Sequence, residues 1–295
     1  SMLSSIFSFS RMSRSGVSSQ IAELTLYSLV GIYGIIFFLS FGASRIAPLS
    51  ENLATRKRLF AIGFVLVAQV FHFFNAHEEV LVVSGIILGL SLIDALTEPL
   101  PIFSRVLAPL RRKPLGSLIG FFFSPGWISG IAFFVLSLAL FPCLILAGAW
   151  LAGSSADLDD IESWVLFLSF GNLILFPLLI IHLFFSNHSS YHFTFGVYVF
   201  VQVAIFVLTL MIIAIGNALS DFEDIIYLCV PLPSVFLYAS MDADADTLLH
   251  LSVAILLMVV CLGFPLIRQR AKVREFLAAL RSPNPPEHAA VSDGN

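Results

Sequence analysis

Seven stretches of the sequence are apolar over a length that suits a membrane-spanning helix, and this feature constrains the fold more than any other. A helix needs about 20 apolar residues to cross a bilayer core of roughly 30 Å. Because backbone amides cannot stay unpaired in lipid, each stretch is predicted to be helical. The predicted segments are residues 22–43, 59–76, 80–97, 127–152, 164–185, 194–216 and 247–267. The sequence therefore predicts an all-α, polytopic transmembrane helical bundle.

Composition supports the same class and limits what else the chain can contain. Hydrophobic residues make up 58% of the sequence and charged residues 12%, whereas soluble domains average about 25% charged residues. Outside the apolar segments no sizeable soluble domain fits, so an ATPase or kinase domain would have to belong to another chain. We divide the chain into a cytoplasmic or interfacial N-terminal tail (1–21), a transmembrane domain (22–275) and a disordered cytoplasmic tail (276–295).

Charged residues are segregated along the chain, which predicts its orientation. Lys and Arg accumulate in the cytoplasmic loops of membrane proteins. The basic segments are 56–58, 105–113 and 268–281, and the acidic segments are 157–162, 221–224 and 242–246. Threading the six segments from residue 59 onward places every basic segment on one side and the acidic segments on the other. The C-terminus is thus predicted to be cytoplasmic, and we expect an integral protein of a bacterial inner (plasma) membrane.

The first apolar segment, 22–43, has Arg11 and Arg14 before it and Arg45 after it. Both flanks therefore resemble cytoplasmic flanks, and two interpretations stay open. The segment either crosses the membrane with its N-terminus outside or lies along the inner interface.

Two stretches between the spans are too short or too interrupted to cross. Residues 102–113 place apolar side chains on one helical face and basic ones off it, which predicts an amphipathic helix on the cytoplasmic surface. Ser124-Pro125-Gly126 then separates a short piece, 115–123, from the next span. On the outer side, residues 225–240 contain Pro231 and Pro233 and predict a re-entrant hairpin, which is tolerable only where protein covers it.

Histidine pairs are the first candidates for chemistry. His72 and His77 lie close in sequence, as do His188 and His192, with His182 nearby. Such spacings occur in membrane metal enzymes, where imidazoles converge on iron. The predicted threading places the two pairs on opposite sides of the membrane. We therefore interpret them as interfacial polar anchors and assign no metal ligand.

Acidic residues near the spans are the second candidates. A carboxylate at bilayer depth is a functional candidate by default. Asp94 lies about one turn before the cytoplasmic end of its predicted helix, Glu98 lies at that end, and Glu23 opens the first segment. Asp94 either has a coupling or gating role, or reaches the interface and pairs with Arg105 or Arg111.

The stretch between the predicted spans 80–97 and 127–152 resembles a signature of ABC-2 type transporter permeases. In residues 111–118 a basic turn leads into Gly116-Ser117-Leu118, and Phe123-Ser124-Pro125 follows. In that family a charged turn, Gly-Thr/Ser-Leu, a short apolar helix and Ser/Thr-Pro occur in this order. The family also has a long span ending in a glycine-containing outer loop, like residues 147–153, and a proline-containing outer turn, like residues 231–234.

The resemblance implies a dimeric permease subunit of an ATP-driven transporter. A separate nucleotide-binding ATPase subunit would hold ATP-Mg, and this chain would contain no catalytic residue, cofactor or nucleic-acid site. Its working parts would be a coupling segment and the outer hairpin with Pro231 and Pro233. The implied coupling residues are Arg105, Arg111, Arg112, Lys113, Gly116, Ser117, Ser124 and Pro125.

Two other classes of function stay open. A membrane-embedded enzyme with a histidine-based metal site predicts bound metal and a different threading. A channel or carrier that does not use ATP, or a subunit of a larger membrane complex, would be favoured if Asp94 faced an aqueous path.

Overall fold

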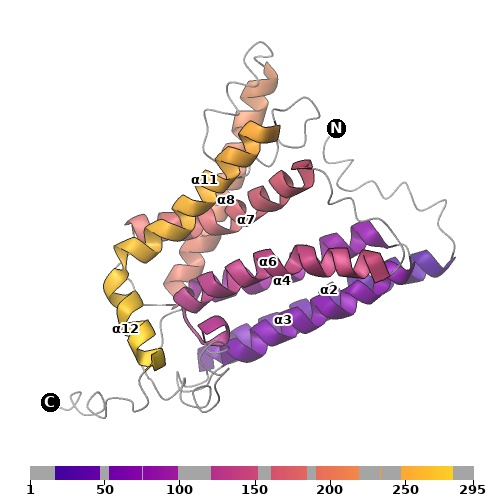
Figure 1. Cartoon of the computed structure of the whole chain (residues 1–295), viewed down its shortest axis with the longest axis horizontal. Coiled ribbons are helices and arrows are strands. Elements are labelled where there is room, and N and C mark those ends of the chain that lie inside the picture. The colour runs from indigo at the N-terminus through magenta and orange to yellow at the C-terminus, as the bar shows by residue number, and fades with distance from the viewer. Residues whose placement is uncertain are drawn as a thin grey trace. The chain divides into compact units, whose positions relative to one another are not determined.

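The computed structural model describes residues 17–46, 53–74, 76–98, 121–151, 161–184, 191–218, 233 and 247–281. The main elements in these ranges are helices, drawn in Figure 1. They are α2 (Val17–Ile46), α3 (Leu53–Gln69), the 3₁₀ helix η2 (Val70–Phe74), α4 (His77–Thr97), α6 (Trp127–Leu151), α7 (Ile161–Phe184), α8 (Tyr191–Ala218), α11 (Thr247–Arg268) and α12 (Arg270–Arg281). Within these described ranges, seven helical stretches are long and apolar enough to cross a membrane. The predicted all-α transmembrane bundle is confirmed.

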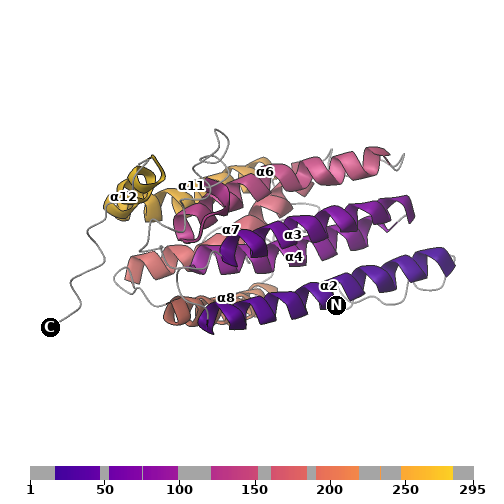
Figure 2. The ribbon, with the colours of Figure 1, turned by 90° about the horizontal axis from the view of Figure 1, so that it is seen from below.

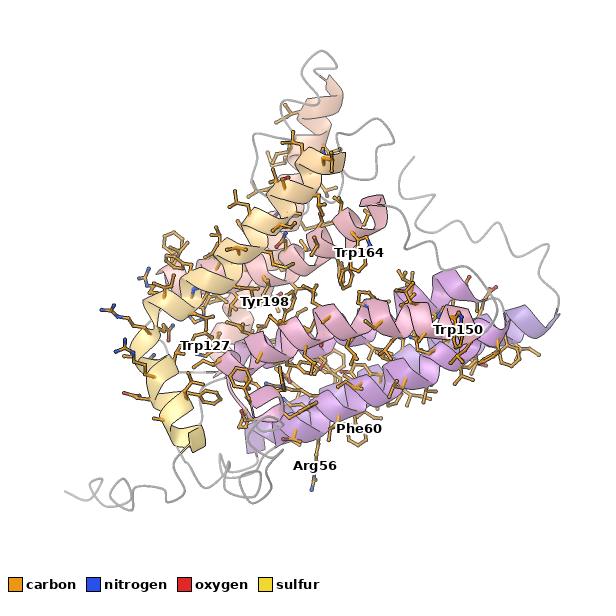
Figure 3. All side chains as sticks on the ribbon, viewed as in Figure 1. Arg56, Phe60, Trp127, Trp150, Trp164 and Tyr198 are labelled. Carbon is orange, nitrogen blue, oxygen red and sulfur yellow. The ribbon has the colours of Figure 1, made fainter. Side chains whose placement is uncertain are left out.

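The helix that carries the first basic cluster differs from its prediction. Because α3 begins at Leu53, the residues Arg56, Lys57 and Arg58 lie in its first turns rather than in a loop. Lys57 and Arg58 are buried, whereas Arg56 is exposed and points away from the ribbon (Figure 3). The distribution of Lys and Arg predicts which side of the membrane a segment faces, but not the residue at which a helix begins. Because Lys and Arg are good helix formers, a basic cluster can form the first turns of a helix.

The chain forms two compact units, and the division between them falls within α3, α4 and α6. The first unit consists of Ser1–Ile46, Arg56–Ser91 and Ala139–Ala156. The second consists of Ala47–Thr55, Leu92–Leu138 and Asp157–Asn295. Each unit therefore contains one portion of α3, one of α4 and one of α6.

In the first unit, α2 packs against α3 and η2. The ring of Tyr33 meets the ring of Phe64 edge-on at a centroid distance of 5.5 Å. Leu26 and Phe37 are buried on the same helix, while 17% of the candidate span Ile21–Ala43 is buried overall. Figure 2 shows α2 as one long helix, and many of its large apolar side chains are exposed. Such a helix presents an apolar surface to lipid on every side that protein does not cover.

In the second unit, α11 packs along α7, and α7 also contacts α8 (Figure 1). Two buried polar side chains join these helices. The Asn172 amide nitrogen donates to the Ala254 carbonyl at 2.8 Å, and the Tyr198 hydroxyl donates to the Ile174 carbonyl at 2.7 Å. In lipid the hydrophobic effect does not drive helices together. Hydrogen bonds between polar side chains and neighbouring helices therefore help to hold them in contact.

Candidate functional site

Buried polar groups from several helix ends meet in the second unit, and we call this cluster the polar junction. It involves the start of α3, the end of α4, the start of α6, the end of α7 and the turn between α11 and α12. Its residues are Thr55, Glu98, Ser124, Gly126, Trp127, Ser129, His182 and Gln269. The sequence threading assigns all five of these helix ends to the same, cytoplasmic side, so their meeting agrees with the predicted order of crossings.

Glu98 accepts two hydrogen bonds from the start of α6 and so joins the end of α4 to it. The Trp127 N–H donates to the Glu98 carbonyl at 3.0 Å, and the Gly126 N–H donates to the Glu98 Oε2 at 3.3 Å. A helix N-terminus has unpaired N–H groups and a partial positive charge, so a carboxylate is favourable there. Residues 99–125, which we call the excursion, thus leave from Glu98 and return to it.

The predicted break at residues 124–126 is confirmed. Gly126 has a φ of 111°, a conformation that glycine adopts at little cost and other residues avoid. The Ser129 hydroxyl bonds to the carbonyl of Ser124 and lies 2.9 Å from that of Gly126. The Thr55 hydroxyl donates to the Phe123 carbonyl at 2.7 Å. The turn into α6 is therefore held by side chains from both α3 and α6.

Trp127 connects this turn to two more helices. Its ring lies against the His182 imidazole with a centroid distance of 4.6 Å. The Gln269 amide nitrogen lies 2.5 Å from the His182 Nδ1, and Gln269 is the residue that separates α11 from α12. Figure 3 shows Trp127 at the end of α6 that is next to the α11–α12 turn. His182 is buried, and its Nε2 has no hydrogen-bond partner within the described residues.

A close backbone contact holds α4 against α6 beside the junction. A Cβ atom built on Gly130 would overlap the Ala95 carbonyl oxygen and approach the Leu96 nitrogen to 3.0 Å. Gly130 is therefore a residue whose missing side chain permits two helix backbones to touch. Small residues have this role in membrane helices, where close packing drives association.

The structure describes only part of the predicted coupling segment. Ser124 and Pro125 lie at the junction, and Ser124 is buried. The other predicted coupling residues, Arg105, Arg111, Arg112, Lys113, Gly116 and Ser117, lie outside the described residues. Of the predicted outer hairpin the structure describes Pro233, which is buried, but not Pro231.

Asp94 lies in the last turn of α4 and is 2% exposed. Its backbone carbonyl accepts a hydrogen bond from the Thr97 hydroxyl at 3.1 Å. Arg105 and Arg111, the partners considered from the sequence, are not among the described residues. Asp94 is thus enclosed by protein one turn before Glu98.

A second buried polar cluster lies in the first unit. The Gln69 amide nitrogen donates to the Ser84 hydroxyl at 3.3 Å, and the Gln69 Oε1 lies 3.2 Å from the His72 Nε2. A Cβ atom on Gly148 would lie 2.7 Å from the His72 ring. The resemblance likened residues 147–153 to the outer end of a span, and α6 is helical through Leu151, as the predicted span 127–152 requires.

Within the residues that the structure describes, no group of three or more His, Cys, Asp or Glu side chains is arranged to hold a metal ion. His72 and His182 instead each contact a glutamine. His77 and His192 lie in the first turns of α4 and α8, and His188 lies outside the described residues.

Comparisons with protein-family models, curated proteins and solved structures found no match. The functional argument therefore rests on the junction. Sequence reasoning had singled out Ser124, Pro125 and the neighbourhood of Glu98, but it missed Gln269 and the contact between Trp127 and His182. A Trp directly after a Ser-Pro-Gly break, at the predicted head-group level, was the available signal for Trp127.

Proposed function

We propose that this chain is the membrane-spanning permease subunit of an ATP-driven transporter of the ABC-2 type. A separate ATPase subunit binds ATP-Mg and engages the excursion on the cytoplasmic side. Two copies of the chain form the transport path, which alternates between inward-open and outward-open states. Because the chain itself then performs no hydrolysis, its task is to convert movement of the excursion into movement of its spans.

The closed base of the excursion is the observation that supports this proposal. Both bonds to Glu98 hold residues 98 and 126–127 together, so the segment between them begins and ends at one point of the bundle. That stretch contains Arg105, Arg111, Arg112 and Lys113 and has no acidic residue. A basic segment on a fixed base suits docking to an acidic surface of a cytosolic partner, since complementary charges guide such encounters.

The contacts of the base supply a route from the excursion to the spans. Displacing the turn at residues 124–126 displaces the start of α6, and with it the Trp127 ring that lies against His182 of α7. The His182 imidazole in turn contacts Gln269 at the end of α11. Packed cores rearrange between discrete states rather than deforming gradually, so a small shift at such a contact can move whole helices.

The test is purification of the tagged full-length chain from its native membranes, followed by mass spectrometry of the proteins that accompany it. We expect a stoichiometric cytosolic ATPase. The double variant Arg111→Glu/Arg112→Glu should insert into the membrane normally. The amount of ATPase that co-purifies with it should fall by at least about tenfold, because charge reversal opposes docking. Arg281→Glu is the matched control, since it reverses a basic residue on the same predicted side outside the excursion.

Three results would contradict the proposal. A preparation without an ATPase would favour a channel, a carrier or a subunit of another complex. Bound iron or zinc in such a preparation would favour a metal enzyme. Equal ATPase recovery with the double variant and the control would show that the excursion is not the docking element.

A further inference from the structure

Exposed basic side chains gather where the last span ends. The candidate span Leu248–Arg268 finishes at Arg268, and Arg270, Lys272 and Arg274 follow within two helical turns, all of them exposed. Glu275 is the acidic residue in this stretch. Residues 268–274 would cover about 9 Å along a helix axis, so four basic residues are concentrated in a short segment.

α12 is amphipathic, and its apolar side is seated on protein. Phe276 is 6% exposed, and its neighbours on the same face, Val273 and Leu277, are partly buried. Positions three and four residues apart share one face of a helix. Arg270 and Arg274 therefore lie on one flank of the apolar face, and Lys272 lies on the other.

The turn between α11 and α12 is held in place. The Gln269 N–H donates to the Pro265 carbonyl at 3.0 Å, and the Val273 N–H donates to the Gln269 carbonyl at 3.0 Å. The Gln269 side chain contacts His182, as described above. The start of α12 therefore has a defined position at the end of the span.

We propose that α12 binds the head groups of anionic phospholipids. Its basic groups begin at the residue where the span ends, which is the level of the lipid phosphates. Because protein covers the apolar face of α12, its exposed basic groups contact the membrane through charge, as basic clusters next to a span do. Each basic residue near an anionic surface strengthens binding by about fivefold. The proposal is independent of the transporter function, because it needs only the end of α11 and the charges of α12.

The test uses the detergent-purified full-length chain with equal amounts of phosphatidylglycerol and phosphatidylcholine that have identical acyl chains. Native mass spectrometry measures the ratio of the two lipids that remain bound. We expect phosphatidylglycerol to predominate. In the triple variant Arg270→Gln/Lys272→Gln/Arg274→Gln the ratio should fall by at least tenfold, since about fivefold is expected for each charge removed.

The charge-conserving variant Arg270→Lys/Arg274→Lys is the matched control and should keep the preference for phosphatidylglycerol. Elution volume on gel filtration checks that both variants are folded. An unchanged lipid ratio in the triple variant would overturn the proposal. So would an equal loss in the charge-conserving variant, because that result would assign the effect to side-chain shape rather than to charge.

Discussion

At the scale of single residues, two glycines of α6 set how closely other helices approach it. Gly130 faces the backbone carbonyl of Ala95, and Gly148 faces the side chains of His72 and Gln69. A backbone group moves only with its helix, whereas a side chain can change rotamer. The two glycines therefore differ in how well their surroundings can adapt to a methyl group.

Alanine at these positions should separate the two cases. We expect Gly148→Ala to lower stability by about 1–3 kcal/mol, as overpacking does, and Gly130→Ala to lower it more. Gly34→Ala is the control, because nothing lies within 4 Å of the position where its Cβ would be. Alanine there should raise stability by up to about 1 kcal/mol. Thermal unfolding in detergent measures all three, and equal stability of the two α6 variants would contradict the packing argument.

At the scale of elements, the start of α6 depends on a carboxylate that is distant in sequence. Glu98 is 28 residues from Gly126, so the cap forms only when α4 and α6 are side by side. The start of α6 does not supply this group locally, because residues 124–126 provide a turn and not an acidic side chain. The cap thus couples the folding of α6 to its packing against α4.

Removing this cap should loosen the base of the excursion. Glu98→Ala removes the oxygen that binds the Gly126 N–H and should cost about 0.5–2 kcal/mol, the usual range for a helix cap. Glu98→Gln keeps an acceptor oxygen and should cost less. Hydrogen exchange of peptides covering residues 124–130 should accelerate in the same order.

Glu275→Gln, at an exposed position on α12, is the control for loss of a carboxylate and should leave that exchange unchanged. Unaltered exchange in Glu98→Ala would mean that the bond between the Gly126 N–H and the Glu98 carboxylate does not hold the turn.

At the scale of the whole molecule, the number of crossings decides where the termini lie. The sequence left two interpretations for residues 22–43. In the structure α2 contacts α3 through Tyr33 and Phe64 and also contacts η2, and Ile21–Ala43 is one of seven candidate spans among the described residues. Packing along a neighbouring span favours a crossing over an interfacial position. An odd number of crossings puts the two termini on opposite sides.

Protease protection of terminal epitope tags tests this topology. In sealed right-side-out vesicles the N-terminal tag should be digested and the C-terminal tag protected. In inverted vesicles the pattern should reverse. Protection or digestion of both tags together would show an even number of crossings and return α2 to the membrane interface.

The location of the spans was accessible from the sequence because the bilayer imposes a length and an apolar composition on each one. The predicted segment 127–152 corresponds to α6 and the segment 247–267 to α11, within a residue at each end. The residues at which individual helices begin and end were harder to predict from the sequence. α3 begins before its basic cluster and ends in η2, and α12 continues past residue 275, where the sequence had placed the start of the tail.

The sequence by itself determined that the chain is a bundle of membrane-spanning helices and which helix ends share a side, because hydropathy and charge act locally along the chain. Only the tertiary structure decided which buried polar groups meet. Gln269 and His182 are 87 residues apart, and no local pattern pairs them. Their contact depends on how α7 and α11 pack, since a buried polar group takes its partner from whichever helix lies beside it.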